Sequence, residues 1–180
     1  MIAYAISDPS TLDFHNLSNS LYSISQKADM IVYRDKQSSN YNTNAIKFLE
    51  RARELSFNKI LIHGNVALAF ELKADGVHLT STQFGEIINA KSRGLFVVIS
   101  THTLDEAIKA ESMGADMVTI SPIFHSPNKG EPLGLLKLQD VCNLVKIPVI
   151  ALGGIISQEQ IDKCKKVGAS GFASIRYFAN

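Results

Sequence analysis

The chain has few cysteines and almost no net charge. Its 180 residues include two cysteines, 18 basic and 17 acidic residues. Cys142 and Cys164 stand alone without a CxxC pair, so we expect a reduced, cytoplasmic protein rather than a disulfide framework. The balanced charge provides no electrostatic attraction for nucleic acid or for an anionic membrane surface.

The sequence also shows no signal peptide, no linker and no metal-binding histidine motif. Residues 1–6 are apolar, but no basic residues flank them and the run is too short to cross a bilayer. No low-complexity tract or Pro/Gly/Ser-rich linker interrupts the chain, which predicts a single domain over residues 1–180. No HxH or HExxH spacing occurs, so we expect no metal site built from histidines.

What the sequence does contain is an alternation of short β-branched runs with amphipathic stretches. Residues 42–56 and 103–114 carry apolar side chains at helical spacing. The runs are mostly apolar rather than strictly alternating, which is typical of parallel strands covered by helices. The expected strands are residues 2–7, 30–34, 59–63, 76–79, 96–100, 117–121, 148–152 and 171–175.

A short repeat supports a closed barrel. KADM, KADG, GADM and GASG begin at residues 27, 73, 114 and 168, each where a helix should end and a strand begin. The interval covers two strand–helix units, so the repeat marks every second strand. A doubly wound sheet shares the alternation, but eight units with this period favour a small single-domain (β/α)8 TIM barrel.

Only five residues follow the last expected strand, so the eighth helix is expected to be missing or reduced to a turn. The apolar surface of the last and first strands would then need another cover. Tyr177 and Phe178 could provide it, or a second subunit could. We therefore expect a homo-oligomer.

Polar residues follow these strands, at the face where barrels of this type carry their active sites. Three cations, Arg34, Lys36 and Lys129, suit a phosphate or carboxylate ligand. The pair Gly153-Gly154 can bring backbone N–H groups close to a phosphate, although a tight turn alone would also explain it.

Four histidines lie at or near the same face: His63, His78 and His102 on three consecutive strands, and His125 within SPIFHSPNKGEPLGL (121–135). A structural role is the more common explanation for any one of them. An acid–base role remains open, because imidazole titrates near neutral pH.

Several segments resemble the thiamin phosphate synthase/TenI family, in register over nearly the whole chain. They are YRDK (33–36), ADGVHL (74–79), STHTLDEA (100–107), ADMVTISPIF (115–124), the loop around Lys129 and IPVIALGGI (147–155). The resemblance implies a small (β/α)8 barrel that acts on a thiazole phosphate. The family's synthases join a pyrimidine pyrophosphate to a thiazole phosphate with Mg²⁺, whereas TenI-type members isomerise a thiazole precursor or have lost synthase activity.

The resemblance also implies roles for individual residues. The expected pyrophosphate contacts are Arg34, Lys36 and Ser100. The expected phosphate contacts are Ser126, Asn128, Lys129, Gly153 and Gly154, with His63 beside the substrate and Arg176 either binding phosphate or blocking its site.

Three departures from the synthase pattern favour TenI-type members. Gly64 and Gln83 stand where the synthases have their Mg²⁺-binding aspartates, and Val32 replaces a pyrimidine-reading glutamine. Glycine offers no side-chain oxygen to a hard cation. The TenI match is incomplete as well, because its strand-6 histidine corresponds to Pro122.

The sequence thus leaves three functions open. The first is a TenI-like thiazole tautomerase that needs no cofactor and uses His125, His102 or His78 as its base. The second is a divergent synthase, in which case Mg²⁺ would be required. The third is a non-catalytic binder of a phosphorylated ligand.

Overall fold

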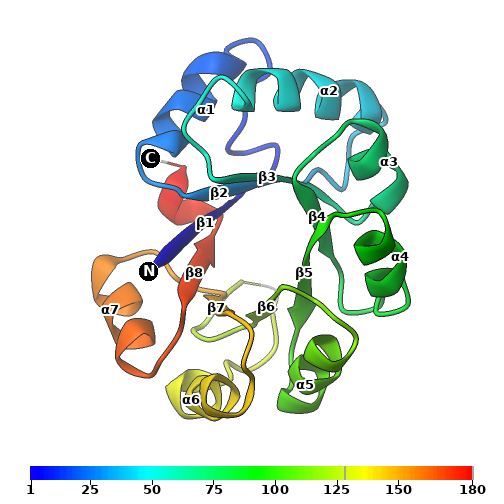
Figure 1. Ribbon diagram of the computed structural model, residues 1–180. Coiled ribbons are helices and arrows are strands. Elements are labelled where there is room, and N and C mark those ends of the chain that lie inside the picture. Colours follow the sequence, from blue (N-terminus) through cyan, green and yellow to red (C-terminus); the bar gives the residue numbers. More distant parts are fainter. Residues whose placement is uncertain (128, 180) are drawn as a thin grey trace.

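The protein folds into a closed eight-stranded parallel barrel with helices around its outside (Figure 1). The computed structural model describes residues 1–127 and 129–179. Each strand pairs with its sequence neighbours, and β8 closes the ring on β1. The strands are β1 (Ile2–Ile6), β2 (Met30–Tyr33), β3 (Lys59–His63), β4 (Gly76–Leu79), β5 (Phe96–Thr101), β6 (Met117–Ile120), β7 (Val149–Leu152) and β8 (Gly171–Ser174).

Seven α-helices of the described chain lie between consecutive strands and cover the ring. The (β/α)8 barrel predicted from the alternation is confirmed, and every strand lies within one residue of its expected bounds. The helices are α1 (Leu17–Ser25), α2 (Tyr41–Ala52), α3 (Val66–Glu71), α4 (Glu86–Ser92), α5 (Leu104–Ser112), α6 (Gly134–Leu144) and α7 (Gln158–Lys166).

The repeated Ala-Asp pair has a definite structural role. The carboxylates of Asp29, Asp75 and Asp116 accept a hydrogen bond from a backbone N–H at the start of the preceding strand, at 2.7 Å in each case. Each aspartate therefore joins two adjacent strands at the N-terminal end of the barrel. The fourth copy of the repeat has Ser170 instead, whose backbone carbonyl accepts from Ile2 N–H at 2.9 Å.

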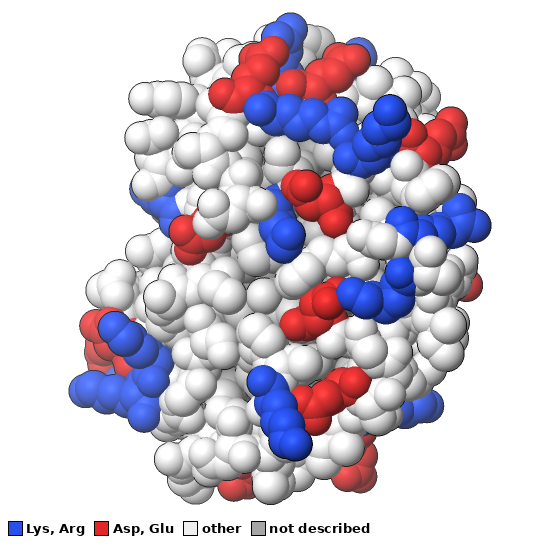
Figure 2. Space-filling view, viewed as in Figure 1, with Lys and Arg blue, Asp and Glu red and all other residues white. Residues whose placement is uncertain are grey.

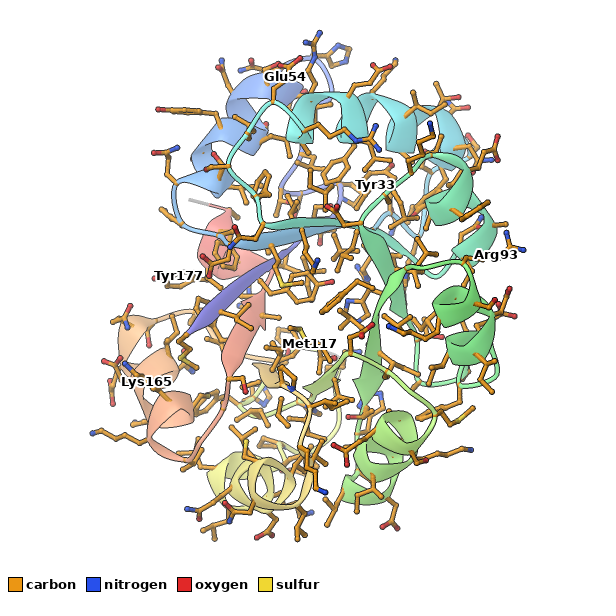
Figure 3. The ribbon with its side chains drawn as sticks, in the orientation of Figure 1. Tyr33, Glu54, Arg93, Met117, Lys165 and Tyr177 are labelled. Atoms are coloured by element: carbon orange, nitrogen blue, oxygen red, sulfur yellow. The ribbon has the colours of Figure 1, made fainter. Side chains whose placement is uncertain are left out.

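Apolar side chains form two cores. The larger one lies between the outer face of the barrel and the helices, where Tyr33 packs against Tyr41 and Phe48. Figure 3 shows Tyr33 directed from the ring towards α2, whereas Met117 lies at the centre of the ring. The inner core fills the barrel with Tyr4, Ile6, Met30, Val32, Leu61, Val98, Met117, Ile150 and Ala173.

After β8 the described chain forms a single 3-10 turn, η1 (Arg176–Phe178), in place of an eighth α-helix. The expected reduction of that helix is confirmed. Phe178 is buried and stacks on Phe172 of β8 with ring centroids 5.7 Å apart, while Tyr177 packs edge-on against Phe172 at 5.2 Å. The two aromatic residues therefore cover part of the strand surface that a full helix would cover.

Charged side chains of both signs are interspersed over the face in Figure 2, and neither sign forms a continuous patch there. Among the helices that the structure describes, none is long and apolar enough to cross a membrane. Cys142 lies in α6 and Cys164 in α7, both as free thiols away from the mouth of the barrel. Burial raises the pKa of both thiols to about 11, which makes them unreactive at neutral pH.

Candidate functional site

The C-terminal ends of the strands surround a cavity of about 330 Å³. Its wall has an apolar part, formed by Ile6, Leu152 and Ile175, and a polar part that includes most of the expected site residues. The expected residues that line it are Arg34, Lys36, His63, His78, Ser100, His102, Ser126, Lys129 and Gly153. The cavity thus combines apolar side chains with cationic and other polar ones, as small-molecule sites commonly do.

Three cations converge on this cavity from two segments. Arg34 and Lys36 follow β2, and Lys129 comes from the loop after β6. The pKa of Lys36 is lowered first by the Arg34 guanidinium, then by partial burial and by Lys129. This mutual repulsion shows that the three charges share one region, and an anionic ligand would relieve it.

Gln83 and Gly64 lie side by side, but they bind each other rather than present ligands to a cation. The Gln83 side chain donates to the Gly64 carbonyl at 2.8 Å and accepts from the Thr80 N–H at 3.0 Å. Gly64 has a φ of +70°, a conformation that side chains rarely adopt. No Asp or Glu lines the cavity within the described part of the chain. The donor set therefore does not fit Mg²⁺, which prefers carboxylate oxygens.

His102 has one ring nitrogen fixed and the other available. Its Nδ1 lies 2.8 Å from the Ser121 carbonyl oxygen, which can only accept, so Nδ1 carries the proton in the neutral ring. Nε2 then has a free lone pair, and the residue lines the cavity. This arrangement suits a general base, because the carbonyl fixes both the tautomer and the ring orientation.

His78 differs, because both of its ring nitrogens already have partners. Nδ1 lies 2.8 Å from the Tyr4 hydroxyl and Nε2 lies 3.0 Å from Ser100 Oγ. Burial, then His63 and Arg34, lower the pKa of His78 to about 3. The pKa of His63 is lowered to about 4 by burial and by the charges of Arg34 and Lys36. Both rings are therefore neutral at neutral pH.

The Gly153-Gly154 turn adjoins a second pocket of about 320 Å³, which shares Ser126, Leu152, Gly153 and Ile175 with the first. Arg176 lines this second pocket. The two glycines have φ values of +98° and +72°, and a Cβ on Gly154 would lie 2.4 Å from the His125 carbonyl oxygen. Close packing against the loop after β6 thus requires glycine at Gly154, whatever the turn binds.

His125 was expected at the site, but it is exposed and lines neither of these two pockets. Asn128 lies outside the described residues. Tyr4 was missed by sequence reasoning, because a tyrosine in an apolar strand usually belongs to the core; its two-residue spacing from Ile6 was the available signal that it faces inward.

The fold and the cavity define a class, a (β/α)8 barrel with a cation-lined cavity at the C-terminal ends of its strands. The family described as thiamine monophosphate synthase, TMP-TENI, matches residues 3–178. The chain therefore belongs to the thiamine monophosphate synthase family.

Curated and solved relatives agree with this assignment. "Putative thiamine-phosphate synthase 2" of Aquifex aeolicus (strain VF5) is 41% identical over 122 residues, which are 66% of this chain and 65% of that protein. The thiamine-phosphate synthase of Clostridium acetobutylicum is 27% identical over 96% of this chain and 84% of its own. The solved thiamine phosphate pyrophosphorylase from Pyrococcus furiosus has a TM-score of 0.82 at 27% identity and covers 97% of this chain and 85% of its own.

Proposed function

We propose that this protein is a synthase-type transferase that joins a pyrimidine pyrophosphate to a thiazole phosphate in thiamine biosynthesis. The observation that carries the proposal is the pair of adjoining pockets, each with at least one cation, which share a wall at Ser126 and Gly153. Two phosphorylated substrates that react with each other need two neighbouring anion sites. The names of the relatives support this reaction over the tautomerase that the sequence departures favour.

In this proposal the cavity lined by Arg34, Lys36 and Lys129 holds the pyrophosphate, and the second pocket, beside Arg176, holds the thiazole phosphate. The carbon–oxygen bond to pyrophosphate breaks with its electron pair, and the thiazole nitrogen forms the new bond to that carbon. Arg34, Lys36 and Lys129 stabilise the negative charge that develops on the departing pyrophosphate.

Because no carboxylate of the described chain lines the cavity with the three cations, we assign no step to Mg²⁺. The expected consequence is that inorganic pyrophosphate binds with similar affinity in the presence of a chelator and in the presence of Mg²⁺. Titration calorimetry under both conditions measures this. A strict need for Mg²⁺ would show that a cation site forms from groups outside this cavity.

A second candidate function rests on His102. Its Nε2 lone pair, fixed by the bond from Nδ1 to the Ser121 carbonyl, suits a base that removes a proton from one ring carbon and returns it to another. Such a 1,3-proton shift needs a held phosphate and no metal. Of the three histidines considered, His125 lines neither pocket and His78 has both nitrogens occupied, whereas His102 lines the cavity. His102 is therefore the base in this second candidate function.

One assay panel separates the candidates. Purified protein is given thiazole phosphate with the pyrimidine pyrophosphate, with Mg²⁺ and with chelator, and separately the thiazole carboxylate phosphate. Release of pyrophosphate together with the joined product supports the transferase. Isomerisation of the carboxylate that is lost in His102→Gln and kept in His125→Gln supports the tautomerase instead. Binding without turnover of either mixture indicates a non-catalytic protein.

A further inference from the structure

Tyr4 is a fully buried polar residue of the barrel interior and contacts His78, which lines the cavity. It lies in β1 with 0% exposure, within the apolar inner core of the barrel. Its ring stacks on His78 with centroids 5.6 Å apart, and its hydroxyl oxygen lies 2.8 Å from His78 Nδ1. Burial also raises the pKa of Tyr4 well above its ordinary value, so the hydroxyl keeps its proton.

The surroundings of Tyr4 decide the direction of this hydrogen bond. If His78 Nδ1 carried the proton, the phenol hydrogen would need another acceptor, and no other hydrogen bond of this hydroxyl is found in the described part of the chain. An unpaired buried donor costs about 1–3 kcal/mol, whereas an unused lone pair costs less. The hydroxyl of Tyr4 therefore donates to Nδ1, and the proton of the His78 ring is on Nε2.

The proton on Nε2 fixes the next bond as well. His78 Nε2 lies 3.0 Å from Ser100 Oγ and must donate to it. The hydroxyl hydrogen of Ser100 is then free to donate into the cavity that Ser100 lines. We propose that Tyr4 is a positioning residue that acts through His78 to make Ser100 a hydrogen-bond donor to an anion in the cavity.

The direction of these hydrogen bonds distinguishes Tyr4, His78 and Ser100 from a nucleophilic triad. In such a triad the imidazole nitrogen that faces the serine is unprotonated and accepts its proton. Here that nitrogen is a donor, so His78 cannot activate Ser100 for attack. The three successive donors point towards the cavity, and hydrogen bonds aligned in this way strengthen one another.

The tautomer of His78 can be measured directly in the unmodified protein. Long-range ¹H–¹⁵N correlation spectra identify which ring nitrogen carries the proton, and the His78 signals are assigned by their loss in His78→Gln. We expect a neutral ring with the proton on Nε2. A proton on Nδ1 at neutral pH would overturn the proposal, because Ser100 would then donate to His78 and not to the ligand.

The anion-binding part rests on the proposed function and uses pyrophosphate as its probe. Tyr4→Phe keeps the ring and removes the donor to Nδ1, so the His78 ring is held less firmly and its Nε2–H is a weaker donor to Ser100. We expect pyrophosphate to bind about threefold to tenfold more weakly. Tyr33→Phe is the matched control, since that buried hydroxyl makes no hydrogen bond of standard geometry within the described residues.

Equal affinity in Tyr4→Phe and Tyr33→Phe would overturn the role of Tyr4 in binding. If the unmodified protein fails to bind pyrophosphate, the proposed function fails, and with it the anion-binding role of Ser100. The proton position on His78 would still confirm or refute the donor direction. The two failures are therefore distinguishable, and the spectrum needs no variant of Tyr4 to fold.

Discussion

Histidines at the mouth of this barrel differ in their surroundings, and the differences determine what each ring can do. His63 and His78 lie on neighbouring strands with ring centroids 5.8 Å apart, next to the Arg34 guanidinium. Burial and positive neighbours favour their neutral forms. His102, by contrast, has Nδ1 bound to a carbonyl, and its Nε2 has no hydrogen bond within the described residues.

Because His63 and His78 are held neutral in the fold, the free energy of unfolding should depend on pH. The pKa of His63 is about 4 in the folded protein, against an ordinary value of 6.5. Between these values the unfolded chain binds a proton that the folded chain does not, so stability falls as the pH falls through this window. In His63→Gln the decrease in the free energy of unfolding between pH 7 and pH 4.5 should be smaller by about 1–3 kcal/mol, after allowance for partial exposure of the ring.

Urea unfolding at pH 7 and at pH 4.5 measures this dependence. The control is His15→Gln, the same substitution at an exposed position outside the cavity. A His63→Gln variant with the same pH dependence as the original protein would show that His63 is already charged in the fold or is not desolvated there.

For individual residues, the sequence predicted which side chains gather at the cavity better than it predicted their hydrogen bonds. Arg34, Lys36 and Ser100 line the expected cavity, since residues just after parallel strands meet at one end of a barrel. The sequence could not rank the histidines, because exposure and hydrogen bonding depend on loop packing. His125 looked as suitable as His102 until the loop placed it outside the pockets.

At the level of strands and helices, the aspartate of the short repeat links neighbouring strands of the barrel. The eight strands were predicted within one residue because their apolar runs are short and bounded by polar residues. The repeat indicated every second strand, but its sequence alone did not show what the aspartate does. Its carboxylate bridges to the preceding strand, an interaction between residues 15 to 26 positions apart.

Removal of one bridge should destabilise the barrel. In Asp75→Ala the Ile60 N–H loses the partner that it has at 2.7 Å, and we expect a loss of about 1–2 kcal/mol in the free energy of unfolding. Asp75→Asn keeps an acceptor oxygen and should lose less. Asp140→Ala, at an exposed position of α6, is the control and should change stability by at most about 0.5 kcal/mol. Denaturant titration of the three variants checks the order, and equal stabilities would contradict the bridging role.

For the whole molecule, closure of the barrel depends on how β8 and β1 are covered. The last turn, η1, supplies Phe178 at 3% exposure in the position of a full helix. A second subunit on the same surface remains a prediction. Sedimentation of the purified protein tests it.

Truncation of Phe178 tests how much the packing of this turn contributes to the stability of the barrel. Phe178→Ala removes the ring that stacks on Phe172, and we expect a loss of about 3 kcal/mol in the free energy of unfolding. Tyr22→Ala is the control, because that side chain is 58% exposed on α1. Thermal unfolding of both variants measures the difference. Equal stability of the two would mean that the turn is dispensable and that β8 is covered in another way.

Calorimetric titration of inorganic pyrophosphate tests most directly whether the cations at the C-terminal end of the barrel bind a phosphorylated substrate. Lys36→Gln removes one of the three charges, and the loss of a charge-assisted hydrogen bond should weaken binding about tenfold to a hundredfold. Lys47→Gln, on the exposed surface of α2, should bind like the original protein. Unchanged affinity in Lys36→Gln, or no binding by the original protein, would show that these cations do not form a phosphate-binding site.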